Sequence, residues 1–147
     1  MEFRAATLDQ ESACLEMMED FYRLSNLPFY EVQASNCFED FIKNDHLGKF
    51  WMITFSGKTI GYLILTFGYS FYHGGRDAFI EEIYLKKEYR NQGFGTHILE
   101  SLHFFASKHD VKAIHLKAEQ GKVDRQRLYM KAGFKGSERQ IFTKIID

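Results

Sequence analysis

One stretch of the sequence constrains the fold more than any other, because its hydrophobic period changes from that of a strand to that of a helix. Residues 78–85 are largely apolar and rich in strand formers, whereas residues 94–109 repeat apolar side chains at helical spacing. A short turn, Arg90-Asn91-Gln92-Gly93-Phe94-Gly95, joins the two segments, and residues 113–118 form a further strand-like segment. This order predicts a βαβ crossover, in which a helix connects two parallel strands.

The turn has the composition of a phosphate site. The first amides of a helix lack partners within the helix, and the helix dipole makes that end attractive to anions. Gly93 and Gly95 have no Cβ, so a phosphate can approach the backbone, and Arg90 adds a cation. Ile98 replaces the third glycine of a dinucleotide motif, and Thr96-His97 follows Gly95 where a nucleotide-triphosphate loop needs Lys-Ser/Thr. For the glycines taken alone, a tight turn that binds nothing is the favoured interpretation.

The rest of the chain predicts alternating helices and strands. Helical spacing favours helices over about 8–24 and 34–42, and Gly133 ends a third over 123–132. Strands are expected at 3–6, at 50–55 and 60–69 as a hairpin, and at Phe134 and 141–145 as closing strands. The expected architecture is α+β: a mixed, mostly antiparallel central sheet flanked by helices on both faces, in a single domain over residues 1–147.

Composition narrows the function. The 19 Lys and Arg residues nearly balance 20 Asp and Glu residues, without a basic run, so we expect no nucleic-acid partner. The longest strongly apolar run, 60–67, is much shorter than a membrane span, and the N-terminus lacks a signal-peptide pattern. Only Cys14 and Cys37 are present, and the histidines at 97, 103 and 109 lack metal-ligand spacing. We therefore expect a cytoplasmic protein with no membrane partner and no bound metal.

Two carboxylates interrupt the apolar strand before the phosphate turn. Strict alternation would place Glu81 on one face with Phe79, Ile83 and Leu85, and Glu82 on the other with Ala78, Ile80 and Tyr84. A carboxylate on a covered face is costly without a partner. Either residue taken singly is as well explained by an ion pair or by contact with solvent, but that explanation is weaker for both together.

Residues 79–134 resemble the GNAT superfamily of acyl-CoA N-acetyltransferases. The central motif Arg/Gln-x-x-Gly-x-Gly/Ala is matched by Arg90, Gly93 and Gly95, and the later motif Leu-Tyr-x-Lys-x-Gly-Phe begins at Leu128 and ends at Phe134. The segment Ile80-Glu81-Glu82-Ile83-Tyr84 is similar to diamine and aminoglycoside N-acetyltransferases. The resemblance implies the GNAT fold, acetyl-CoA as donor and a primary amine as acceptor.

The resemblance also implies roles for individual residues. Glu81 is the first choice for the general base, with Glu82 second or as an anchor for the amine, and Tyr129 would protonate the leaving thiolate. Lys122 stands where the family often has an asparagine that helps to hold the donor, so either Lys122 contacts a phosphate of CoA instead or the donor takes a different local route. The backbone of Ile83, Tyr84 and Leu85 would pair with the pantetheine arm. The residues around the pyrophosphate would be Arg90, Asn91, Gln92, Gly93, Phe94, Gly95 and Thr96.

The acceptor is less constrained than the donor. Most aromatic side chains are expected in the core, but Tyr30, Tyr69, Phe71 and Tyr72 fall in or beside predicted loops. With Asp77 they form a possible pocket for a cationic small amine. The alternatives are a protein lysine or N-terminal acetyltransferase, and a non-catalytic acyl-CoA-binding regulator. A homodimer is common among the proteins that the chain resembles.

Overall fold

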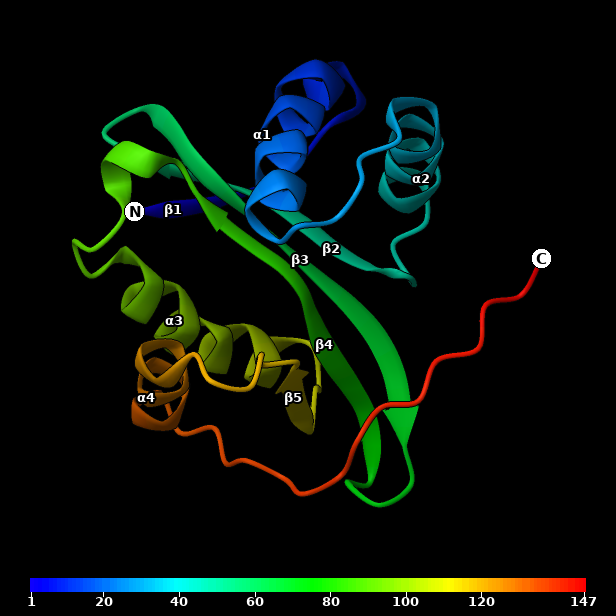
Figure 1. The fold of residues 1–147 in the computed structure, drawn as a ribbon, viewed down its shortest axis with the longest axis vertical. Helices are drawn as coiled ribbons and strands as arrows, with labels where there is room; N and C mark the ends of the chain where they lie inside the picture. Colours follow the sequence, from blue (N-terminus) through cyan, green and yellow to red (C-terminus); the bar gives the residue numbers. More distant parts are fainter. The chain divides into compact units, whose positions relative to one another are not determined.

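The computed structural model describes all 147 residues, Met1–Asp147. The chain divides into two compact units, Met1–Lys117 and Ala118–Asp147, which we describe separately (Figure 1). None of the helices combines the length and apolar character that a membrane crossing requires.

The first unit is built on a five-stranded sheet in the order β1-β2-β3-β4-β5. Neighbouring strands are antiparallel except β4 and β5, which are parallel and are joined through a helix as the βαβ pattern predicts. The long β3–β4 hairpin forms the middle of this sheet (Figure 1). The strands are β1 (Glu2–Ala5), β2 (Gly48–Phe55), β3 (Lys58–Ser70), β4 (Gly75–Leu85) and β5 (Ala113–Leu116).

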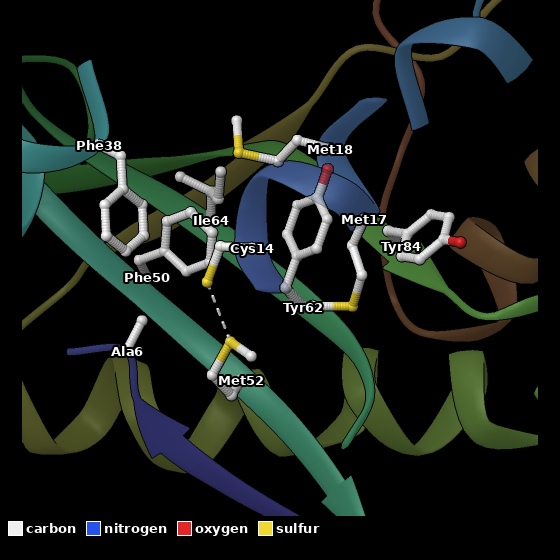
Figure 2. Close-up of a cluster of buried hydrophobic side chains, with 10 residues drawn as sticks. All are labelled: Ala6, Cys14, Met17, Met18, Phe38, Phe50, Met52, Tyr62, Ile64 and Tyr84. Atoms are coloured by element: carbon white, nitrogen blue, oxygen red, sulfur yellow. Dashed lines mark hydrogen bonds between the residues drawn. The ribbon is translucent and has the colours of Figure 1, made fainter. Parts of the chain in front are cut away.

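Two helices, α1 (Glu11–Leu24) and α2 (Glu31–Lys43), cover one face of this sheet. A short 3-10 turn at Leu8–Gln10 precedes α1, and in it the Gln10 side chain accepts a hydrogen bond from the Thr7 amide at 3.0 Å. The helical spacing predicted for this segment is confirmed, because the buried side chains of α1, Cys14, Met17 and Met18, follow it. Figure 2 shows them against side chains of β2, β3 and β4. This cluster comprises Ala6, Cys14, Met17, Met18, Phe38, Phe50, Met52, Tyr62, Ile64 and Tyr84.

Helix α3 (Phe94–Lys108) covers the opposite face. Trp51 of β2 and Phe67 of β3 alternate away from the α1/α2 cluster, and both rings pack on Phe105 of α3, at centroid distances of 4.7 and 6.1 Å. Ile98 and Leu102, which follow the helical spacing predicted over residues 94–109, are buried. The expected α+β sheet with helices on both faces is therefore confirmed.

A β-bulge in β4 changes which side chains share a face. Ile64 pairs with Glu82, but the next residue of β3, Leu65, pairs with Ile80, so Glu81 is the extra residue on β4. A bulge places two residues opposite one and interrupts the alternation of side chains. The expected alternation through residues 78–85 was therefore wrong. Glu81 and Glu82 both lie on the α1/α2 face, whereas Ile80 faces α3 with Leu65.

The second unit contains one helix, α4 (Val123–Lys131). It ends beside Gly133, whose φ of 97° is the left-handed conformation expected of a residue that stops a helix. The predicted closing strands at Phe134 and 141–145 were wrong, because residues 132–147 form no strand. A strand needs a neighbour to satisfy its backbone groups, and this unit provides no second strand. Ile141, Phe142, Ile145 and Ile146 are accordingly exposed.

A close approach between β3 and β4 gives a test of the hairpin. A Cβ added to Gly61 would lie 2.0 Å from the carbonyl oxygen of Tyr84, an atom that cannot move without breaking strand pairing. We expect Gly61→Ala to lower the free energy of unfolding by about 2 kcal/mol or more. Gly136 has open space around its added Cβ, so Gly136→Ala should have little effect. Equal urea midpoints for the two variants would contradict this account of the hairpin.

Candidate active site

The parallel strands β4 and β5 part at the bulge. Their pairing runs from Asp77 opposite Ala113 to Ile80 opposite Leu116, and it ends there. Beyond that point β4 continues to Leu85 with β3 as its only strand partner. Residues 81–85 therefore present one edge of backbone donors and acceptors that no strand uses. Ile83, Tyr84 and Leu85, the residues predicted to bind the pantetheine arm, lie on this edge.

The predicted phosphate turn forms an uncapped helix start. Gly93 precedes α3 with a φ of 87°, and no side chain caps the helix. The first bond of the helix runs from the amide of His97 to the carbonyl of Gly93. The amides of Phe94, Gly95 and Thr96 therefore lack intrahelical partners, and the first turn carries no acidic residue. The turn has the features expected of an anion site, and the exposed residues Asn91 and Gln92 lead into it.

Arg90 joins this turn to β4 and α1. Its Nε donates to the carbonyl of Leu85 at 2.7 Å, and its guanidinium lies 3.5 Å from Asp20 of α1. The hydroxyl of Tyr84 donates to the same Asp20 carboxylate at 2.5 Å, and the guanidinium lies 5.4 Å from the centre of the Tyr84 ring. Arg90 thus fixes the start of the turn through contacts within the protein. Asp20 was not among the predicted site residues, because nothing in the spacing of α1 distinguishes it from the other charged residues of that helix.

Glu82 is held by two tyrosine hydroxyls. Tyr62 of β3 donates to Oε1 at 2.8 Å, and Tyr22 of α1 donates to Oε2 at 3.2 Å. Burial raises the pKa of Glu82 above its ordinary value, the two hydrogen bonds act in the opposite direction, and the nearby Glu81 carboxylate raises it further. Burial together with the Glu82 charge also raises the pKa of Tyr22 to about 12. Glu82 therefore connects α1 to the middle of the sheet.

Glu81 is the more accessible of the two carboxylates. Its side chain is exposed, and its one hydrogen bond is with Oγ1 of Thr66, at 3.2 Å. It lies at the point where β4 and β5 separate, on the face that carries Glu82. No cation pairs with it, so its carboxylate is available to a cationic ligand or to water.

An open cleft of about 890 Å³ lies between α1 and the end of β4. Among the residues predicted for the site, only Tyr84 lines it. The short 3-10 helix η2 (Lys87–Tyr89) contributes Lys87 and Glu88, and the α1–α2 connection contributes Leu27 and Phe29. The other lining residues are Ala13, Glu16, Met17, Glu19, Asp20, Arg23, Thr59 and Lys86.

The aromatic residues predicted for the acceptor pocket do not line this cleft. Tyr30 is 62% exposed, and Tyr69, Phe71 and Tyr72 lie at the tip of the β3–β4 hairpin with 72%, 92% and 91% exposure. Asp77, in contrast, is only 8% exposed. Its Oδ2 lies 3.0 Å from Nε2 of His115 on β5.

His115 was not among the predicted site residues, because placing it requires the exact register of two parallel strands, and a slip of one residue moves a side chain to the other face of the sheet. Aligning the starts of the predicted segments, 78–85 and 113–118, would put His115 opposite Ile80, whereas the structure pairs it with Phe79. Their rings lie 4.7 Å apart.

Two predicted site residues belong to the second unit. Tyr129 lies in α4, and its ring packs 6.4 Å from that of Phe134. Lys122 immediately precedes α4, with its Nζ 3.3 Å from a carboxylate oxygen of Glu119. Within this unit the two residues lie at opposite ends of α4.

Comparisons with known proteins agree on the fold. A family model described as the acetyltransferase (GNAT) family matches residues 15–134. A search of curated proteins finds no relative that matches this sequence. A predicted acetyltransferase with acetyl-CoA from Clostridium acetobutylicum is similar in structure, with a TM-score of 0.79 and 19% identity over 97% of this chain and 95% of that one.

Two further solved structures share the fold. An aminoglycoside antibiotic 6'-N-acetyltransferase from Acinetobacter baumannii has a TM-score of 0.76 and 19% identity, covering 99% of this chain and 98% of its own. A ribosomal-protein-alanine N-acetyltransferase from Brucella melitensis has a TM-score of 0.77 and 13% identity, covering 99% and 100%. At these identities the likeness shows a common fold and leaves the acceptor open.

The family match includes the bulged strand, the turn and α4. Together with the shared fold, it confirms the resemblance stated from the two sequence motifs. The chain therefore belongs to the acetyltransferase (GNAT) family and is an acetyl-CoA-dependent acyltransferase.

Proposed function

We propose that this enzyme transfers an acetyl group from acetyl-CoA directly to the primary amine of a small molecule. The observation that carries the proposal is that an accessible carboxylate, Glu81, lies where β4 separates from β5 and its backbone edge becomes available. A strand edge of this kind can pair with the amide groups of a pantetheine arm. We propose that Ile83, Tyr84 and Leu85 supply that edge.

The start of α3 suits the pyrophosphate of the donor. The amides of Gly93, Phe94, Gly95 and Thr96 are the proposed ligands, with Asn91 and Gln92 beside them. Arg90 supports this turn through Leu85 and Asp20 and adds positive potential. Lys122 would contact another phosphate. When bound, the donor supplies an electrophilic thioester carbonyl, and the protein supplies the groups that move protons.

Glu81 is the proposed general base. Alkyl amines have pKa values near 10, so the acceptor arrives mainly as an ammonium ion that cannot attack. Glu81 takes a proton from the nitrogen, directly or through a water molecule, and frees its lone pair to form the C–N bond. As the C–S bond breaks, Tyr129 gives its hydroxyl proton to the departing sulfur. The proposed transfer is direct, without an acyl-enzyme, since neither Cys14 nor Cys37 falls near the two sequence motifs.

The charge around Glu81 favours a cationic acceptor. Three carboxylates, those of Asp77, Glu81 and Glu82, lie on one face of β4, and their hydrogen-bonding partners are His115, Thr66 and two tyrosines rather than lysine or arginine. Tyr30, Tyr69, Phe71 and Tyr72 are proposed to contact the apolar part of the acceptor. The similar fold of an aminoglycoside acetyltransferase supports this class of substrate.

A protein acceptor remains the second candidate. The observation that favours it is the open cleft of about 890 Å³ beside α1 and the structural likeness to a ribosomal-protein-alanine N-acetyltransferase. A non-catalytic acyl-CoA sensor would bind the donor without consuming it. CoA release across polyamines, aminoglycosides, amino acids and peptides separates these functions.

The organisation of the protein is also part of the proposal. We infer one acetyltransferase domain over residues 1–147, since the family model extends across both compact units. Two free cysteines support a reducing, cytoplasmic location. A homodimer is expected from the resemblance, and sedimentation at micromolar concentration tests it.

The loss of the Glu81 carboxylate should slow turnover without weakening donor binding. We expect Glu81→Gln to lower kcat about 100-fold or more, with the KM for acetyl-CoA little changed, because it removes the proton acceptor but not the donor site. The measurement is steady-state CoA release with the best amine of the panel. Glu88→Gln, which alters an exposed carboxylate outside the bulge, is the matched control. Parent-like turnover by Glu81→Gln would refute the assignment of the base.

Glu82 should make stability depend on pH. Because its pKa is raised in the folded protein above the ordinary 4.5, the folded state holds the proton more tightly than the unfolded state. Its stabilising contribution is complete below about pH 4.5 and is lost as pH rises through the higher folded pKa. The parent should therefore lose free energy of unfolding relative to Glu82→Gln over that interval. Urea denaturation of both proteins from pH 4 to 8 measures the difference, and parallel curves would contradict it.

Tyr129 should act on the leaving group alone. We expect Tyr129→Phe to lower kcat about 10- to 100-fold while leaving acetyl-CoA affinity unchanged, because the ring is kept and only the hydroxyl is lost. A donor with a more acidic thiol leaving group needs less protonation, so the deficit should shrink with it. A deficit that is the same for both donors would argue against a proton-donor role.

A further inference from the structure

A histidine–aspartate pair lies on the same sheet face as the proposed base. Asp77 of β4 is 8% exposed, and its Oδ2 is 3.0 Å from Nε2 of His115 on β5. The His115 ring centre lies 4.7 Å from that of Phe79 and 5.4 Å from that of His73. A buried carboxylate and two aromatic neighbours therefore fix the orientation of this imidazole.

The Asp77 contact determines which ring nitrogen can accept a proton. An ionised carboxylate only accepts hydrogen bonds, so Nε2 of His115 carries the hydrogen that points to Asp77. In the neutral ring the other nitrogen, Nδ1, then has a free lone pair. The side chain of His115 is 31% exposed, and no hydrogen bond occupies Nδ1. The pair thus presents a fixed proton acceptor that solvent or a ligand can reach.

Strand register places His115 on the same sheet face as Glu81, opposite Phe79 and two residues of β4 away. His115 pairs with Phe79, Phe79 pairs across β3 with Thr66, and the Thr66 hydroxyl contacts Glu81. Thr66, Phe79 and His115 form one row over β3, β4 and β5 on the α1/α2 face, and Glu81 follows Phe79 along β4 on that face. The pairing of β4 with β5 ends one position beyond His115, at Ile80 and Leu116. His115 on β5 therefore lies just before the point where β4 and β5 separate, and Glu81 on β4 lies just after it.

Proton balance gives this second acceptor a task. An alkylammonium ion has three N–H bonds and its amide product has one, so two protons leave the nitrogen during acetylation. One is lost before the lone pair attacks, and the other is lost as the C–N bond becomes an amide. A single carboxylate that has taken the first proton cannot take the second until it is discharged.

We propose that His115, oriented by Asp77, is a second catalytic proton acceptor for the acceptor amine. The inference rests on the proposed function. Glu81 removes the first proton from nitrogen, and Nδ1 of His115 removes the second as the C–N bond forms and the C–S bond breaks. The departing sulfur gains a proton from Tyr129. Glu81 and His115 return their protons to water, from which Tyr129 recovers one, so one proton is released for each amide formed.

The charged and titratable groups around His115 are consistent with this task. Asp77 faces it from β4, His73 from the β3–β4 turn, and Glu81 follows along β4 on the same face. Asp77 is a positioning residue, because it acts through His115 and not on the amine.

Removal and chemical replacement of the imidazole test the proposal. We expect His115→Ala to lower kcat about 100-fold with the KM for acetyl-CoA unchanged, and added imidazole to restore about a tenth of the lost rate. His115→Gln, which keeps a donor for Asp77 but cannot accept the proton, should lose as much activity and gain nothing from imidazole. Asp77→Asn should also be slow, because the amide favours the wrong tautomer of His115.

Matched controls separate this inference from the function on which it rests. His103→Gln changes an exposed histidine of α3 and should behave as the parent does. Melting temperature and acetyl-CoA binding are measured for every variant, so that misfolding is seen. Parent-like kcat in a folded His115→Gln, or no imidazole rescue of a folded His115→Ala, would overturn the inference alone. No turnover of any amine by the parent would overturn the proposed function and this inference with it.

Discussion

The extra residue in β4 is the constraint on which the rest of the site depends. Without it, Glu81 would point to the α3 face and Ile80 would take its place beside Thr66. The bulge instead puts Glu81 and Glu82 on one face and coincides with the end of the β4–β5 pairing. One local irregularity thus places two adjacent carboxylates on one face, at the point where a free strand edge begins. Since a bulge costs regular pairing, its presence at this point fits a functional role.

The side chains beyond the bulge hold α1 against this edge. The Glu82 carboxylate accepts hydrogen bonds from Tyr22 of α1 and Tyr62 of β3. The Asp20 carboxylate of α1 accepts a hydrogen bond from Tyr84 and lies near Arg90. Each buried carboxylate therefore has donors, as the cost of burying charge requires. The same contacts fix the strand, the phosphate turn and one wall of the open cleft relative to one another. Glu82 and Arg90 thus have structural partners as well as their proposed places in the site.

The sequence predicted most of the fold because hydrophobic period is a local property. The helices, the hairpin and the turn at Gly93 follow from spacing and glycine chemistry, and the two motifs predicted the family correctly. The bulge was not predictable from the hydrophobic period. Residues 78–85 have the composition of a strand whether or not one residue is left unpaired, and the bulge changes only the face to which the side chains point. The apolar run at 141–145 suggested a strand, but strand formation depends on a partner that local sequence does not specify. His115 required the register of two distant strands, and the roles of the site residues stay predictions.

Backbone hydrogen exchange tests the central claim, which is that β4 beyond the bulge and the start of α3 hold the donor. The measurement is residue-resolved amide exchange with and without saturating acetyl-CoA. The account predicts slower exchange for amides of residues 83–85 that point away from β3 and for those of residues 93–96, with the amides bonded to β3 unchanged. Donor binding shown in the same sample, with no added protection in either segment, would contradict the account.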